Sequence, residues 1–186
     1  MHLYIKNMVC NRCKMVVKAE LEKLGFKSLL VELGEVILDQ NDSAADKIKI
    51  SKQLGHFGFE LLEDKKTQIA EQIKTAIINL VHYTKEPLKT NLSAYLSEQL
   101  KLEYASLSSI FSEVENQTIE KYFIAQKIEK VKEMLTYGEL TLSEIAAQLN
   151  YSSVAHLSTQ FKKVTGMTPS VYKSGSTDRR KTLDEV

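Results

Sequence analysis

Residues 141–172 read TLSEIAAQLNYSSVAHLSTQFKKVTGMTPSVY, and their pattern predicts two short helices joined by a tight turn. In the first helix, apolar residues recur at the spacing of one helical face, at Leu142, Ile145, Ala146 and Leu149. Thr141, followed three residues later by Glu144, fits a capping box. After a turn at residues 150–152, a second apolar stripe consists of Val154, Leu157, Phe161 and Val164. Gly166 and Pro169 then favour the end of the second helix.

The free face of the second predicted helix carries small and basic side chains. These are Ala155, His156, Thr159, Lys162 and Lys163. Insertion of a helix into the major groove of DNA requires such a face on a helix that is braced by another one. No acidic residue lies between Glu144 and Asp178, so attraction to phosphate is expected mainly here, although the formal net charge is only +1.

The same pattern occurs fifty residues earlier, which indicates an internal repeat. Phe111, Val114, Thr118 and Tyr122 match Phe161, Val164, Thr168 and Tyr172 at a constant offset. Asn116 stands where Gly166 stands, as the next-best residue for a left-handed conformation. We therefore predict two helix-turn-helix units, at residues 92–116 and 141–166, joined by a connecting helix at 118–136. A straight helix of that length spans roughly 28 Å, which is consistent with recognition helices about one DNA turn, ~34 Å, apart.

The second motif resembles that of AraC-type transcription regulators, and the resemblance extends over residues 65–174. It implies that bases are read by Ala155, His156 and Thr159 in the second unit and by Ala105, Ser108 and Ser109 in the first, with Lys162 and Lys163 on phosphates. The first unit departs from the family pattern. Ser112 and Glu113 stand where basic residues are usual, and this segment is acidic overall.

Residues 1–64 predict a different kind of unit. Strand and helix patterns alternate in the order βαββαβ, which is typical of a ferredoxin-like α+β domain, and the chain is wholly helical from residue 65 onward. We thus expect an α+β domain at 1–64, an all-α tandem helix-turn-helix domain at 65–174 and a disordered polar tail at 175–186. The chain has no apolar run of transmembrane length and no signal-peptide pattern, so we expect a cytoplasmic protein without membrane contact.

The two cysteines of the chain, Cys10 and Cys13, form a CxxC motif between the first strand and the first helix. A helix N-terminus favours thiolates, and two close thiolates suit a soft ion, above all Cu(I). Zn(II) usually takes four ligands, so it would require His2, His56 or a second chain. The segment from Met8 through Cys13 resembles the MxCxxC loop of heavy-metal-associated domains of the copper-chaperone type. That resemblance implies that the cysteines are ligands and that Met8 packs inward.

These patterns favour a metal-responsive, sequence-specific transcription regulator that binds double-stranded DNA. A metal ion shared between the thiolates of two chains would bridge them into a homodimer. Two alternatives stay open: a metal-trafficking or storage protein whose helical half is an oligomerisation or partner module, and a thiol-disulfide sensor. The main rival to metal binding at the CxxC motif is a thioredoxin-like dithiol, but that fold normally needs a longer unit and a proline facing the pair, and both prolines lie outside the CxxC unit. The sequence has no catalytic constellation, so an enzyme is not expected.

Overall fold

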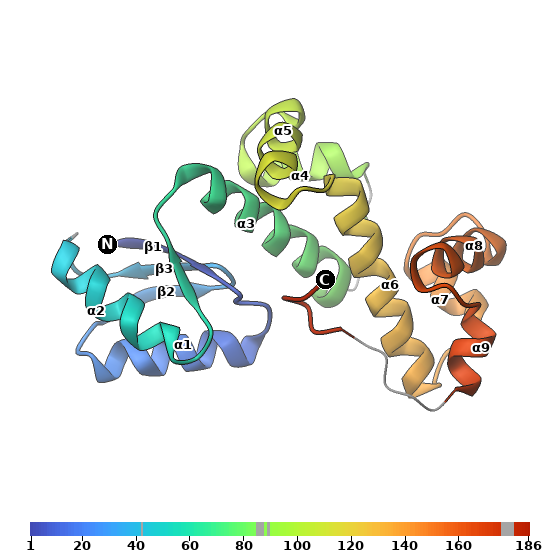
Figure 1. Ribbon diagram of the computed structural model, residues 1–186, viewed down its shortest axis with the longest axis horizontal. Helices are drawn as coiled ribbons and strands as arrows, with labels where there is room; N and C mark the ends of the chain where they lie inside the picture. The colour runs from blue at the N-terminus through green and yellow to red at the C-terminus, as the bar shows by residue number, and fades with distance from the viewer. Residues whose placement is uncertain (42, 85–87, 89, 176–180) are drawn as a thin grey trace. The chain divides into compact units, whose positions relative to one another are not determined.

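A computed structural model describes residues 1–41, 43–84, 88, 90–175 and 181–186 (Figure 1). A small antiparallel sheet comes first and an all-helical region follows, which confirms the predicted division of secondary structure. By packing, the chain forms two compact units. The first comprises residues 1–75 and 105–116, and the second comprises 76–104 and 117–186.

The sheet of the first unit contains β1 (His2–Lys6), β2 (Ser28–Glu32), β3 (Glu35–Leu38) and β4 (Glu60–Leu62). Its strand order is β2-β3-β1-β4, with antiparallel pairing throughout. Leu3 and Ile5 alternate with more exposed residues along β1, so one face of the sheet is buried. Helices α1 (Asn11–Lys23) and α2 (Ala44–Gly55) cover that face with Val17, Leu21, Ile50 and Leu54.

Helix α3 (Lys65–Ile78) continues as a short π-helix, η1 (Asn79–Tyr83), so the helical segment expected from residue 65 onward begins with one long helix whose winding changes near its end. Two further helices, α4 (Leu92–Leu100) and α5 (Tyr104–Glu115), follow. The predicted loop at 85–90 falls largely outside the described residues. Sequence periodicity does not distinguish a π-helical turn from an α-helical one, because the same apolar face continues through both.

The core of the second unit forms around α6 (Ile119–Tyr137). This helix packs with α7 (Leu142–Gln148), α8 (Val154–Thr165) and α9 (Pro169–Ser174). Ile145, Leu157 and Phe161 are completely buried, and the Phe161 ring meets Tyr172 edge-on at 5.5 Å. Val164, expected in the apolar stripe of α8, is instead 47% exposed. It lies at the last turn of the helix, beyond the reach of that core.

The internal repeat is visible in the backbone. Asn116 and Gly166 both have left-handed φ angles, 52° and 80°. Lys101 and Asn150, forty-nine residues apart, share a φ of 55° after α4 and α7. Thr118 and Thr168 both cap the next helix, accepting bonds from the backbone N–H groups of Lys121 and Val171. Left-handed residues and threonine caps at corresponding positions support two copies of one motif.

The tail differs from its prediction where it is described. The backbone N–H of Lys181 donates to Glu129 Oε2 at 3.1 Å, and the carbonyl of Leu183 accepts from Gln126 Nε2 at 3.3 Å. Residues 181–186 therefore have partners on α6, which a low apolar content could not reveal. Residues 176–180 of the predicted tail lie outside the described residues. Among the described residues, no helix combines the length and apolar character that crossing a membrane requires.

Candidate nucleic-acid interface and cysteine pair

Helix α8 presents all five of its predicted DNA-contacting residues to solvent. Ala155, His156, Thr159, Lys162 and Lys163 are exposed, while Leu157 and Phe161 hold the opposite face in the core. Ser153 caps the helix by accepting from the backbone N–H of His156 at 3.1 Å. At the other end of the second motif, the predicted capping box of α7 is present, with Thr141 and Glu144 bonded reciprocally. The pair α7–α8 is thus a rigid frame for an exposed, basic helix face.

The imidazole of His156 is oriented by two neighbours that the sequence reading did not assign to it. Its Nδ1 lies 3.0 Å from the hydroxyl of Ser152, and its ring meets Tyr151 edge-on at 5.4 Å. With Nδ1 engaged, Nε2 is the ring nitrogen that points to an outside partner. A histidine fixed in this way is better suited to contact a base edge than a freely rotating one, because less side-chain entropy is lost.

Helix α5 carries the predicted contact residues of the first motif. Ala105 and Ser109 are exposed and Ser108 is half-buried. By packing, this helix belongs to the first compact unit, whereas α8 belongs to the second. The structure therefore does not gather the two sets of predicted DNA contacts into one compact unit.

The acidic residues of α5 have partners within the first unit. Glu113 accepts from Lys66 Nζ at 2.6 and 2.7 Å, and Glu115 lies 3.7 Å from Lys74 Nζ. Both lysines are on α3. Glu113, which stands where the family pattern has a basic residue, thus has a basic partner on α3. Sequence reasoning missed them because the partners are more than forty residues apart and share no periodic pattern.

Cys10 and Cys13 lie together at the start of α1. Cys10 is the N-cap residue and Cys13 is in the first turn, with their Sγ atoms 3.4 Å apart and both side chains partly exposed. Met8 is 1% exposed and packs in the core of the unit, as predicted. Two adjacent sulfurs open to solvent fit a two-coordinate soft ion.

The surroundings of Cys10 and Cys13 affect the ionisation of the Cys13 thiol. Burial has the largest effect on the Cys13 thiol and raises its pKa, although a backbone hydrogen bond with Val9 opposes this. At Cys13, burial therefore opposes the stabilisation of thiolate that the helix N-terminus provides. Within the described ranges, no group of three or more His, Cys, Asp or Glu side chains could hold a metal ion, so neither His2 nor His56 completes the pair. His2 instead contacts Glu35 at 2.6 Å.

The loop that carries the cysteines is tied to α3. Asn7, directly before Met8, has a left-handed φ of 70°. Its backbone N–H donates to Glu71 Oε1 at 3.1 Å, and its side chain donates to the carbonyl of Gly58 at 2.9 Å. Glu71 is buried, which raises the pKa of its carboxyl, and its other oxygen lies 3.6 Å from Lys74 Nζ. Lys74 thus links Glu71 to Glu115 of α5.

In each half of the repeat, α4 with α5 and α7 with α8, two helices follow one another across a short turn, which is the order of a helix-turn-helix motif, a type of motif that binds DNA. Residues 96–175 match the family model described as a helix-turn-helix domain. The matched segment is similar to that family and includes α5 to α9.

Several known proteins are similar to more than half of the chain. The xylose operon regulatory protein of Escherichia coli K12 is 24% identical over 114 residues, which are 61% of this chain and 29% of that protein. The chain thus spans less than a third of that relative's length.

Among solved structures, the C-terminal domain of AraT, a response regulator from Geobacillus stearothermophilus, has a TM-score of 0.50 at 23% identity, covering 63% of this chain and 97% of that one. This likeness shows the fold alone. The C-terminal domain of the response regulator yesN from Fusobacterium nucleatum is 31% identical, with a TM-score of 0.47 over 55% of this chain and 98% of that one.

Proposed function

We propose that this chain is a sequence-specific transcription regulator that binds double-stranded DNA and responds to Cu(I) or a similar soft ion. The observation that carries the DNA-binding part is the exposed face of α8, where an oriented His156 stands beside Ala155 and Thr159, and Lys162 and Lys163 follow. The helix-turn-helix family match supports the same reading. Bases are then read by His156 and Thr159, while the two lysines hold phosphates.

Removing the two lysines tests this assignment. Each phosphate contact contributes about 0.9 to the slope of log affinity against log salt on duplex DNA. We expect Lys162→Ala with Lys163→Ala to reduce that slope by about 1.8 on a DNA site selected from a random library. Fluorescence anisotropy between low and moderate salt measures it.

The matched control is Lys49→Ala with Lys52→Ala, two exposed lysines on α2. This variant should keep the wild-type slope. Equal slopes for all three proteins would remove Lys162 and Lys163 from the interface. If the wild-type protein selects no sequence at low ionic strength, the regulator proposal fails as a whole.

The metal part of the proposal assigns residues 1–64 to a ferredoxin-like, heavy-metal-associated domain. The strand order β2-β3-β1-β4, the buried Met8 and the adjacent sulfurs of Cys10 and Cys13 support it. The two thiolates would hold the ion, whose bound charge is the signal. A four-coordinate ion such as Zn(II) would take its other ligands from a second chain, which gives a metal-bridged homodimer.

The cysteine pair is tested by replacement. We expect Cys10→Ser with Cys13→Ser to lose bound copper, measured by elemental analysis after anaerobic Cu(I) loading, because both soft ligands are removed. DNA binding without copper should remain. Copper content equal to that of the wild type would refute the ligand assignment.

The main alternative, a metal-trafficking or storage protein, rested on the acidic first motif. Glu113 and Glu115 have lysine partners on α3, so their charge has a structural explanation that does not require a partner protein. A mobility-shift assay on genomic fragments, with and without Cu(I), separates the two functions. The thiol-disulfide sensor is separated by comparing reduced, metal-free protein with oxidised protein.

A further inference from the structure

The second compact unit contains a cavity that the proposed function does not use. It has a volume of about 660 Å³ and lies among η1, α6 and the turn after α7. Ligand pockets in proteins usually have volumes of roughly 300–1,000 Å³. Leu80, Phe123 and Leu149 provide apolar walls. The cavity therefore has the size and the apolar lining of a small-molecule site.

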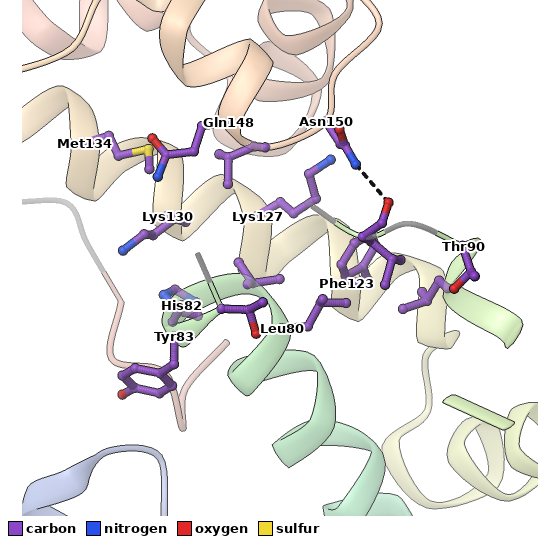
Figure 2. A pocket seen from close by; sticks show the side chains of 15 residues that line it. Leu80, His82, Tyr83, Thr90, Phe123, Lys127, Lys130, Met134, Gln148 and Asn150 are labelled. Atoms are coloured by element: carbon purple, nitrogen blue, oxygen red, sulfur yellow. Dashed lines mark hydrogen bonds between the residues drawn. The ribbon is translucent and has the colours of Figure 1, made fainter. Parts of the chain in front are cut away.

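The charged side chains that line the cavity are basic. In Figure 2 the side chains of Lys127 and Lys130 on α6 lie between His82 of η1 and Asn150. Among the described lining residues there is no Asp or Glu. Lys130 is paired with Glu133 at 3.2 Å, and His82 with Gln126 at 2.9 Å. Lys127 makes no ion pair with a described residue.

The ammonium group of Lys127 is held by aromatic rings instead. Its Nζ lies 3.8 Å from the centre of the Tyr151 ring and 5.5 Å from that of Phe123. Burial lowers the pKa of Lys127 to about 8, since water is removed from the charge. The ring face stabilises the cation in part. An anionic group in the cavity would replace the missing water and form a charge-assisted bond.

We propose that this cavity binds a small molecule with an apolar body and one carboxylate, and that Lys127 is the residue that receives the carboxylate. The apolar body packs against Phe123 and Leu149. Asn150 has one amide hydrogen engaged by the carbonyl of Leu88 at 3.3 Å and can donate its other one to the same ligand.

The site has a short structural connection to the DNA-facing helix. Tyr151 is buried, donates its hydroxyl proton to Gln160 Oε1 of α8 at 2.7 Å and contacts the ring of His156. A ligand that draws the Lys127 ammonium from the Tyr151 ring would thus act on a residue that orients His156. The binding test needs no DNA, so its outcome stands apart from that of the proposed function.

The experiment uses the full chain and 4-phenylbutyrate as the probe, with the uncharged 4-phenylbutanol as comparison. We expect saturable shifts of the His82, Lys127 and Asn150 amide signals in NMR spectra of the wild-type protein upon addition of 4-phenylbutyrate. Lys127→Met keeps the length of the side chain but removes its charge, and should weaken probe binding by at least about tenfold. The alcohol should bind wild type and Lys127→Met equally.

Lys121→Met is the matched control, because Lys121 is exposed on the same helix and does not line the cavity. It should bind 4-phenylbutyrate like the wild type. The amide shifts of the wild-type protein test the proposal even if a variant does not fold. Their absence, or equal affinity of Lys127→Met and Lys121→Met for the carboxylate, would overturn the proposal.

Discussion

His82 is a half-buried titratable residue whose protonation should be visible in the stability of the chain. Burial lowers the pKa of its imidazole, so the folded chain binds a proton there less readily than the unfolded chain does. For a base with a lowered pKa, the stabilisation is complete above the unfolded value of about 6.5 and is lost as the pH falls through it. We predict that the melting temperature of the wild type falls more steeply below about pH 6.5 than that of His82→Gln.

Differential scanning calorimetry between about pH 5 and pH 8 measures this difference. His56→Gln is the control, because His56 is exposed at the end of α2 and should leave the pH profile unchanged. Parallel profiles for the wild type and His82→Gln would show that His82 does not contribute to the acid sensitivity of the fold.

At the scale of elements, the end of α8 depends on the backbone of Gly166. Its φ is 80°, and a Cβ atom added there would meet no atom within 4 Å. The cost of Gly166→Ala therefore comes from the left-handed backbone conformation, which disfavours a side chain, and not from clashes with neighbouring atoms. We expect a loss of about 1–2 kcal/mol in the free energy of unfolding. Urea denaturation measures it. Gly55→Ala in α2, which also has open space but no left-handed φ, should cause no loss.

The local turn chemistry of the repeat could be predicted from sequence, because caps and left-handed residues act within a few positions. Thr141 with Glu144, Asn116 and Gly166 all take the roles that their residue types favour. The surroundings of α5 could not be predicted in this way. Its acids contact Lys66 and Lys74 across a long stretch of chain, and such tertiary pairs leave no periodic trace.

In the candidate site, too, some features could be predicted from the sequence and others could not. The exposed face of α8 follows from helical periodicity, and the CxxC placement follows from the strand and helix patterns that flank it. The contacts of Tyr151 with Lys127 and His156 depend on how α6 packs beside the turn of the second motif. They became apparent only from the folded chain.

At the scale of the molecule, the cysteine loop and α5 are linked by one chain of contacts in the first unit. Asn7 bonds to Glu71, Glu71 contacts Lys74, and Lys74 contacts Glu115. This chain is a route by which copper could alter the first motif, a coupling between two sites. We predict that Glu71→Ala keeps its copper content but loses the dependence of DNA affinity on Cu(I), measured by anisotropy.

Glu60→Ala is the control for that prediction, because the carboxylate of Glu60 forms an exposed ion pair with Lys6 at 3.8 Å. It should respond to Cu(I) like the wild type. A full Cu(I) response in Glu71→Ala would exclude this route. If the wild type itself shows no response, the metal part of the proposed function fails instead.

The first compact unit is assembled from two separated segments, residues 1–75 and 105–116. During synthesis on the ribosome, the sheet and α3 emerge before α5. Lys66 and Lys74 therefore cannot form their ion pairs with Glu113 and Glu115 until α5 has been synthesised. No single cut in the chain releases either unit whole. Fragments meant for separate expression should therefore be designed around residues 105–116 rather than around the end of the sheet.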